Sequence, residues 1–130
     1  MDIYTGSKIC MLSSQLFLIA SLYNFNWGNY IESVTIYFLY ITSWYYHSNP
    51  TPINKAIDEF MVKTAIIVTV VISLYNYNIL PFVCTIILSY MYYKRPDCKI
   101  PCTICNLYHA SCVHFIAFLG FISIYYNKNI

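Results

Sequence analysis

Long apolar stretches alternate with short polar breaks along this chain. Each break is rich in Asn, Pro or Gly, which end one helix and allow the next to begin. The apolar stretches cover residues 9–23, 31–46, 57–75, 79–93 and 104–126. A helix needs about 20 apolar residues to cross the bilayer core. The pattern therefore predicts an all-α fold, an integral membrane bundle of about five transmembrane helices that forms one domain, residues 1–130.

The ends of the stretches refine this prediction. The first and fourth are short, and flanking Tyr, Asn and Trp complete them. A four-helix arrangement, with the first stretch lying on the membrane surface, is the main alternative. No small-residue cleavage site follows residues 9–23, so we expect a retained helix rather than a signal peptide. Thr51 followed by Pro52 is typical of an N-cap and the first residue of the third helix.

Composition supports a lipid environment. The chain is 59% hydrophobic and only 9% charged, whereas a soluble domain is about 25% charged. Tyrosines lie near most ends of the apolar stretches, where a membrane interface favours an aromatic ring with a wet hydroxyl. AT-rich coding would raise the tyrosine count but would not explain this placement. The net charge of +2 is too small and dispersed to predict nucleic-acid binding.

The basic residues predict an orientation. With five spans, the N-terminus, the 47–56 loop and the 94–101 linker share one side of the membrane. That side carries Lys8, Lys55, Lys94, Arg95 and Lys99, and Lys63 can snorkel toward it. Lys128 lies opposite. The positive-inside rule then predicts a cytoplasmic N-terminus, and we expect an internal membrane such as that of the endoplasmic reticulum or Golgi.

Polar residues that are distant in sequence fall at a similar depth on this side. They are Ser43, His47, Asp58, His109 and His114, and they include all 3 histidines of the chain. Ionisable groups within a membrane are costly and are functional candidates. Three neutral imidazoles and a water form a catalytic zinc shell. A nearby Asp58 can move a proton of that water, and Ser43 can donate a hydrogen bond to an oxyanion.

A simpler interpretation stays open beside the metal site. A histidine at a helix end is commonly an interface residue. Asp58 and Glu59 follow a proline turn, where acidic side chains complement the helix dipole.

The segment Ser43-x-x-x-His47, followed after ten residues by Asp58-Glu59, resembles the motif of the alkaline ceramidases, a family of seven-helix membrane hydrolases. Leu119-Gly120 stands at that family's distance beyond the second histidine of its last helix, here His114. The resemblance implies that His47 and His114 bind zinc, that Asp58 holds the zinc water and that Ser43 assists at the oxyanion. It also implies hydrolysis of a ceramide-like lipid amide in the bilayer.

The chain departs from that family in two ways. His109 and His114 are five residues apart rather than four, so in a straight α-helix they diverge by about 140°. A π-bulge would restore their convergence; otherwise His109 is not a ligand. The chain also has room for about five helices instead of seven, which removes part of the wall of a lipid cavity and leaves a reduced or inactive relative as an alternative.

Two further interpretations remain. Cys98, Cys102, Cys105 and Cys112, with His109, could bind a structural zinc, although free thiols or palmitoylation sites fit the irregular spacing better. The second functional hypothesis is a non-enzymatic membrane protein, from a virus or parasite with AT-rich coding, that has a structural or host-interaction role. Assembly into a homo-oligomer is compatible with either hypothesis.

Overall fold

The computed structural model describes residues 3–94 and 108–126, and within these ranges every regular element is helical. The elements are α1 Ile3–Asn26, α2 Tyr30–Ser48, α3 Pro52–Tyr75, α4 Ile79–Tyr93, the π-helix η1 His109–His114, and α6 Phe115–Tyr126. The all-α prediction is confirmed for the described residues. The start of the fifth expected helix, at residue 104, lies outside them.

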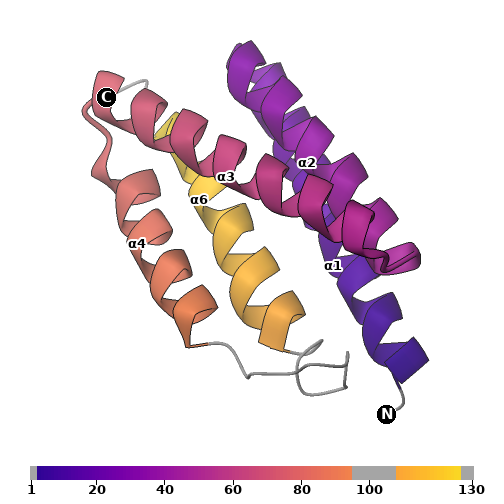
Figure 1. Cartoon of the computed structure of the whole chain (residues 1–130). Coiled ribbons are helices and arrows are strands. Elements are labelled where there is room, and N and C mark those ends of the chain that lie inside the picture. The colour runs from indigo at the N-terminus through magenta and orange to yellow at the C-terminus, as the bar shows by residue number, and fades with distance from the viewer. Residues whose placement is uncertain (1–2, 95–107, 127–130) are drawn as a thin grey trace.

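The helices form a ring rather than an open row. Each of α1 to α4 packs against the next, α4 packs against α6, and α6 with η1 returns to α1. Figure 1 shows the start of α1 and the start of α6 toward one end of the molecule and the end of α6 toward the opposite end. The ring brings the last helix beside the first, so residues about 100 positions apart can meet in its interior.

Short capping interactions fix where the helices begin. Thr51 is the N-cap of α3, its side chain accepts a hydrogen bond from the Asn54 backbone N–H at 3.1 Å, and Pro52 is the first helical residue. This predicted boundary is confirmed. Asn78 caps α4 in the same way, because its side chain accepts from the Leu80 N–H at 3.2 Å. Both caps satisfy N–H groups that the first turn of a helix leaves without partners.

The interior of the ring holds as many polar as apolar side chains. The apolar cluster contains Phe17, Ala20, Ile36, Leu39, Ala65, Leu88, Val113, Ala117 and Phe121. The buried polar residues are Ser14, Ser21, Asn24, Glu32, Ser33, Ser43, His47, Asp58, Thr69, Ser73, Asn78 and His114. Buried polar groups need partners, and here many of those partners lie on another helix.

Small and polar residues therefore join the helices. The hydroxyls of Ser21 and Ser33 each donate to the other residue's carbonyl, at 2.8 and 2.7 Å, and tie α1 to α2. The Asn24 amide donates to the Phe121 carbonyl at 3.1 Å and ties α1 to α6. At Gly120, an added Cβ would lie 3.1 Å from the Cβ of Cys84, so α6 approaches α4 closely where glycine is present. Such contacts are typical of helix packing in lipid.

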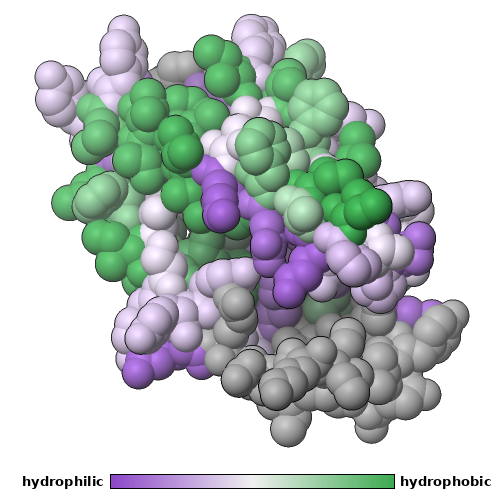
Figure 2. Space-filling view, in the orientation of Figure 1, coloured by the Kyte–Doolittle hydropathy of each residue, from purple (hydrophilic) through white to green (hydrophobic). Residues whose placement is uncertain are grey.

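Large apolar side chains lie on the outside of the ring. The most exposed of them include Leu12, Ile31, Ile53, Phe60, Ile67, Leu74 and Ile79, each more than 60% exposed. Figure 2 shows hydrophobic side chains over much of one face, with hydrophilic ones in its middle and toward its lower edge. A soluble protein usually has an apolar interior and a charged surface. This structure buries many polar side chains and exposes many apolar ones.

Among the described residues, one helical segment is both long and apolar enough to cross a membrane, Lys8–Asn26. The segments Ile79–Tyr93 and Cys112–Ser123 are apolar but shorter. A buried helix of a soluble protein can meet the same criterion, so length and apolarity alone do not separate the two classes.

Candidate metal centre

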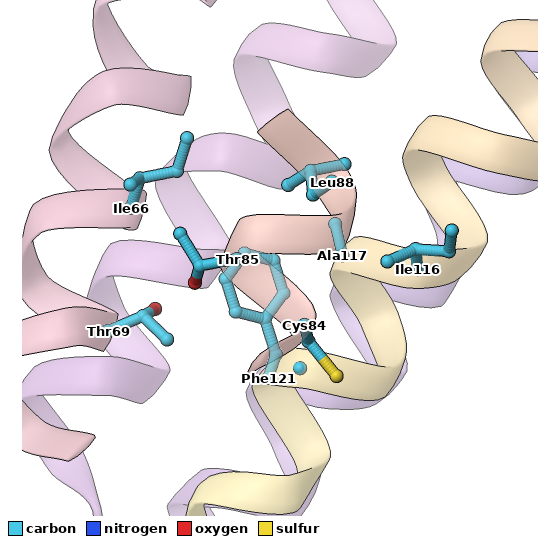
Figure 3. A pocket seen from close by; sticks show the side chains of 9 residues that line it. Ile66, Thr69, Cys84, Thr85, Leu88, Ile116, Ala117 and Phe121 are labelled. Atoms are coloured by element: carbon cyan, nitrogen blue, oxygen red, sulfur yellow. The ribbon is translucent and has the colours of Figure 1, made fainter. Parts of the chain in front are cut away.

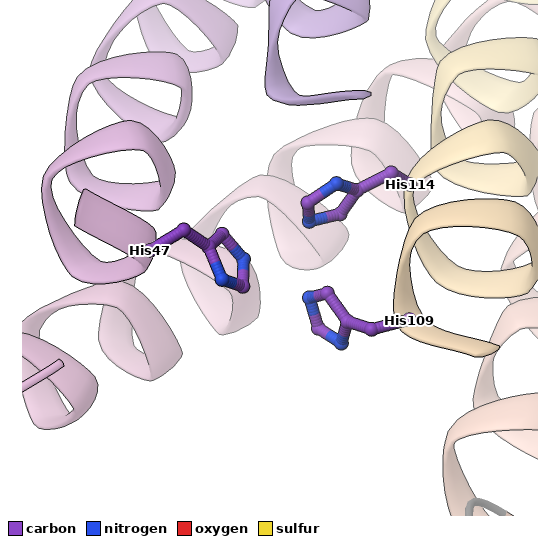
Figure 4. A group of neighbouring side chains, drawn as sticks. All are labelled: His47, His109 and His114. Atoms are coloured by element: carbon purple, nitrogen blue, oxygen red, sulfur yellow. The ribbon is translucent and has the colours of Figure 1, made fainter. Parts of the chain in front are cut away.

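The three histidines converge at one point inside the ring. His47 comes from the last turn of α2, and His109 and His114 are the two ends of η1. The ring centroids lie 5.1 Å apart for His47 and His109, 5.2 Å for His47 and His114, and 4.4 Å for His109 and His114. Figure 4 shows the three rings directed toward a common space. The five-span topology predicts a similar depth for them, and the closed ring of helices brings them close together.

The π-helix explains why two histidines five residues apart can face the same way. A π-turn closes i to i+5, so His109 and His114 lie one above the other instead of diverging. The π-helix spans these two residues from end to end. The distortion that the spacing required is therefore present, and its position within the chain matches the histidine pair. π-turns are uncommon and concentrate at functional sites.

The donor set could hold a metal ion. One ring nitrogen from each of the three histidines can be chosen so that all lie within 4.8 Å of one another. In a tetrahedral site with metal–nitrogen distances of about 2.0–2.1 Å, such nitrogens lie about 3.4 Å apart. Side-chain shifts of about 1.4 Å in total would bring the widest pair to that distance. Three histidine ligands would leave a fourth coordination position open.

His114 is the most enclosed of the three rings, at 2% exposed. Its Nδ1 forms a hydrogen bond with the Ser13 hydroxyl, and its Nε2 lies 3.5 Å from the Ser43 hydroxyl. Phe17 packs edge-on against it, with ring centroids 5.0 Å apart. α1, α2 and η1 therefore all contribute to holding one imidazole.

Ser43 lies at the site, as the sequence predicted, and is also tied to α1. Its hydroxyl is 2.9 Å from the hydroxyl of Ser14, and the residue is 1% exposed. It stands one turn before His47 on α2, so both face the interior. Its expected role at an oxyanion stays a prediction.

Asp58 is buried near the start of α3 but does not belong to the group of ligand atoms formed by the histidines. Its Oδ1 accepts a hydrogen bond from the Thr42 hydroxyl at 3.2 Å. Thr42 is the neighbour of Ser43 in sequence, so the carboxylate is linked to the site through α2. Its expected role as a partner of the zinc water stays a prediction.

Sequence reasoning missed several polar residues that the ring buries. Ser13, Ser14 and Thr42 contact the predicted site residues, yet a serine or threonine in an apolar helix has no motif to distinguish it. Glu32 carried a stronger signal, because an acidic side chain in an apolar stretch is a functional candidate by default. It is fully buried on α2 and accepts from the Thr69 hydroxyl on α3 at 2.7 Å.

A half-open groove lies along α6 beyond the histidines. Its volume is about 20 Å³, between α3, α4 and α6. The lining residues are Ile66, Thr69, Cys84, Thr85, Leu88, Ile116, Ala117, Gly120 and Phe121. Figure 3 shows these side chains around the space, most of them apolar. Its first lining residue on α6 is Ile116, and none of the three histidines lines it.

Most of the expected cysteine cluster lies in a part of the chain that the structure does not describe. Cys98, Cys102 and Cys105 lie outside the described residues. Within the described part, the metal-binding group consists of histidines alone.

Comparison with known proteins adds no assignment. No protein-family model matches the chain, and neither does any curated protein or solved structure. The arrangement of the described residues is what supports a functional proposal.

Proposed function

We propose that the chain is a zinc-dependent hydrolase embedded in a membrane, which cleaves the amide bond of a ceramide-like lipid. The observation that carries the proposal is the convergence of His47 on α2 with His109 and His114, which are aligned by the π-helix. Ser43 lies beside the ring of His114. The π-helix is a rare distortion, and it lies where it aligns His109 with His114. A ligand shared by the two rings would explain why the backbone keeps this strained geometry.

The distribution of side chains supports the membrane part of the proposal. Buried serine, asparagine and acidic residues share the interior of the ring with its apolar cluster, while many isoleucine, leucine and phenylalanine side chains are exposed on its outside. In water this arrangement would expose apolar surface and bury polar groups, and both cost free energy. In lipid the outside is at no disadvantage, and interhelical hydrogen bonds and close contacts hold helices together.

The chemistry follows from the donor set. When bound, a zinc ion with three histidine ligands lowers the pKa of its water and polarises a carbonyl. His47, His109 and His114 would hold the ion. Ser43 is placed to donate its hydroxyl hydrogen to an oxygen that becomes negatively charged. The Asp58 carboxylate accepts a hydrogen bond from Thr42, the residue next to Ser43, and would accept a proton from the attacking water.

A lipid is proposed as substrate because apolar side chains cover the outside of the ring. The small groove between α3, α4 and α6 is mainly apolar, and its lining residues include none of the three histidines.

Metal content tests the proposal directly. We expect the protein purified in detergent to contain about one zinc per chain by mass spectrometry, and His47→Ala and His114→Ala to lose most of it, because removing one of three ligands weakens the site strongly. Trp44→Leu, on the exposed face of the same α2 turn, should keep the metal.

Activity is measured on the same samples with a fluorescent ceramide in mixed micelles. Ser43→Ala and Asp58→Asn should keep zinc and lose fatty-acid release by about 10²-fold or more. Zinc below about one-tenth per chain in the unmutated protein would contradict the proposal. Bound zinc without hydrolysis would favour the non-enzymatic hypothesis.

A further inference from the structure

Ser13 is a residue that no motif singled out, yet it contacts a proposed metal ligand. Its hydroxyl bonds to Nδ1 of His114 and also donates to the Cys10 carbonyl at 3.0 Å. A serine hydroxyl has one hydrogen and two acceptor lone pairs. The carbonyl can only accept, whereas a histidine nitrogen can donate or accept, so both contacts are hydrogen bonds only when the hydrogen of Ser13 goes to Cys10.

This arrangement determines the tautomer of His114. Because Ser13 has already given its hydrogen to the Cys10 carbonyl, its oxygen accepts from His114, and Nδ1 must carry the ring hydrogen. The neutral ring then has its lone pair on Nε2. Figure 4 shows one ring nitrogen of His114 directed toward His109. With Nδ1 bonded to Ser13, that inner nitrogen is Nε2, the atom that lies 3.5 Å from Ser43.

We infer that Ser13 is a positioning residue of the metal centre, which holds His114 in the Nδ1–H tautomer so that Nε2 is presented to the ion. The inference rests on the proposed function for the identity of the ion. Metal-binding histidines commonly donate their second ring N–H to such an oxygen, which fixes the ring's orientation and makes the ligand more basic.

The adjacent Ser14 offers a matched comparison. Its hydroxyl donates to the same Cys10 carbonyl, at 2.8 Å, but its other contact is the Ser43 hydroxyl at 2.9 Å. Either of these two hydroxyls can be the donor to the other, so Ser14 contacts Ser43 rather than a ligand ring. The two neighbouring serines of α1 thus differ in which part of the site each one fixes.

The first test needs no metal. Protein labelled with ¹⁵N-histidine is prepared zinc-free in detergent, and the ring nitrogens of His114 are assigned with His114→Gln. We expect the Nδ1–H tautomer in the unmutated protein and in Ser14→Ala. Ser13→Ala should populate both tautomers, and Ser13→Thr, which keeps the hydroxyl, should restore the first. An Nε2–H tautomer, or no change in Ser13→Ala, would overturn the inference.

The second test measures zinc affinity by competition with a chelator. Ser13→Ala should weaken binding by about 10–100-fold, and Ser13→Thr should recover most of the loss. Ser14→Ala should stay within about threefold, since it removes no contact to a ligand. Equal affinities for Ser13→Ala and the unmutated protein would overturn the positioning role.

The two failures can be told apart. An unmutated protein that binds no zinc would overturn the proposed function, while the NMR measurement still decides the tautomer. Far-UV circular dichroism and the cobalt-complex spectrum of each variant separate a lost fold from a changed ligand field.

Discussion

Glu32 shows at the scale of one residue how the interior differs from an ordinary core. It is 0% exposed, and one carboxyl oxygen accepts from Thr69 while the other has no hydrogen-bond partner within the described structure. Burying a carboxyl group costs free energy when its oxygens lack hydrogen-bond partners. The contact of Glu32 with Thr69 therefore has a structural or functional role between α2 and α3.

Two substitutions at this position should differ. Glu32→Gln keeps an oxygen for the Thr69 hydroxyl, and we expect its stability to change by less than about 1 kcal/mol. Glu32→Ala leaves that hydroxyl without its acceptor and opens a cavity, which should cost about 2–4 kcal/mol. Thermal unfolding in detergent measures both, with Glu59→Ala as a control on the partly exposed side of α3. Equal melting temperatures for the alanine and glutamine variants would contradict this expectation.

Site residues could be predicted where their type and position along the sequence indicated a shared location in the fold. His47, His109 and His114 stood out because the chain has 3 histidines and the topology placed them together. Ser13 could not be found in this way, since its role depends on the hydrogen bond to His114, which is 101 residues distant. The pairing of α1 with the last helix that creates this contact is a property of the ring and not of any local pattern.

At the scale of elements, the apolar pattern predicted where the helices lie. The spacing of His109 and His114 indicated where a π-helix would be needed. The predicted stretch 31–46 became Tyr30–Ser48, and 79–93 became Ile79–Tyr93. The third helix begins at its N-cap rather than at its first apolar residue, because capping and not hydropathy sets a helix start. The π-helix was a conditional prediction, stated only as the geometry that both ligands would need.

The π-helix can be tested by changing its length. Deleting Ala110 puts the two histidines four residues apart, where a regular α-helix aligns them, so we expect zinc affinity to stay within about tenfold of the unmutated value. Inserting one alanine after Ser111 separates them by six residues and should weaken binding by more than about 100-fold. Chelator competition measures both. If deletion and insertion weaken binding equally, the alignment argument fails.

At the scale of the molecule, the termini of the described structure lie at opposite ends of the ring (Figure 1). If the helices cross the bilayer, ends on opposite sides mean that the chain crosses it an odd number of times. We expect a reporter fused after residue 130 to lie on the opposite side of the membrane from one fused before residue 1, with the N-terminal reporter in the cytoplasm. Fusion after Asn49, in the α2–α3 turn, should match the N-terminal reporter. A cytoplasmic C-terminal reporter would contradict the five-span arrangement.

Ring closure by the last helix also sets the order of events during synthesis. When translation has reached residue 94, α1 to α4 exist, but Ser13 and Asn24 still lack the partners that η1 and α6 supply. Only one of the three histidines has then been made. A chain halted at this stage would leave these polar groups of α1 without their contacts to the last helix, and the three histidines could come together only after that helix has been made.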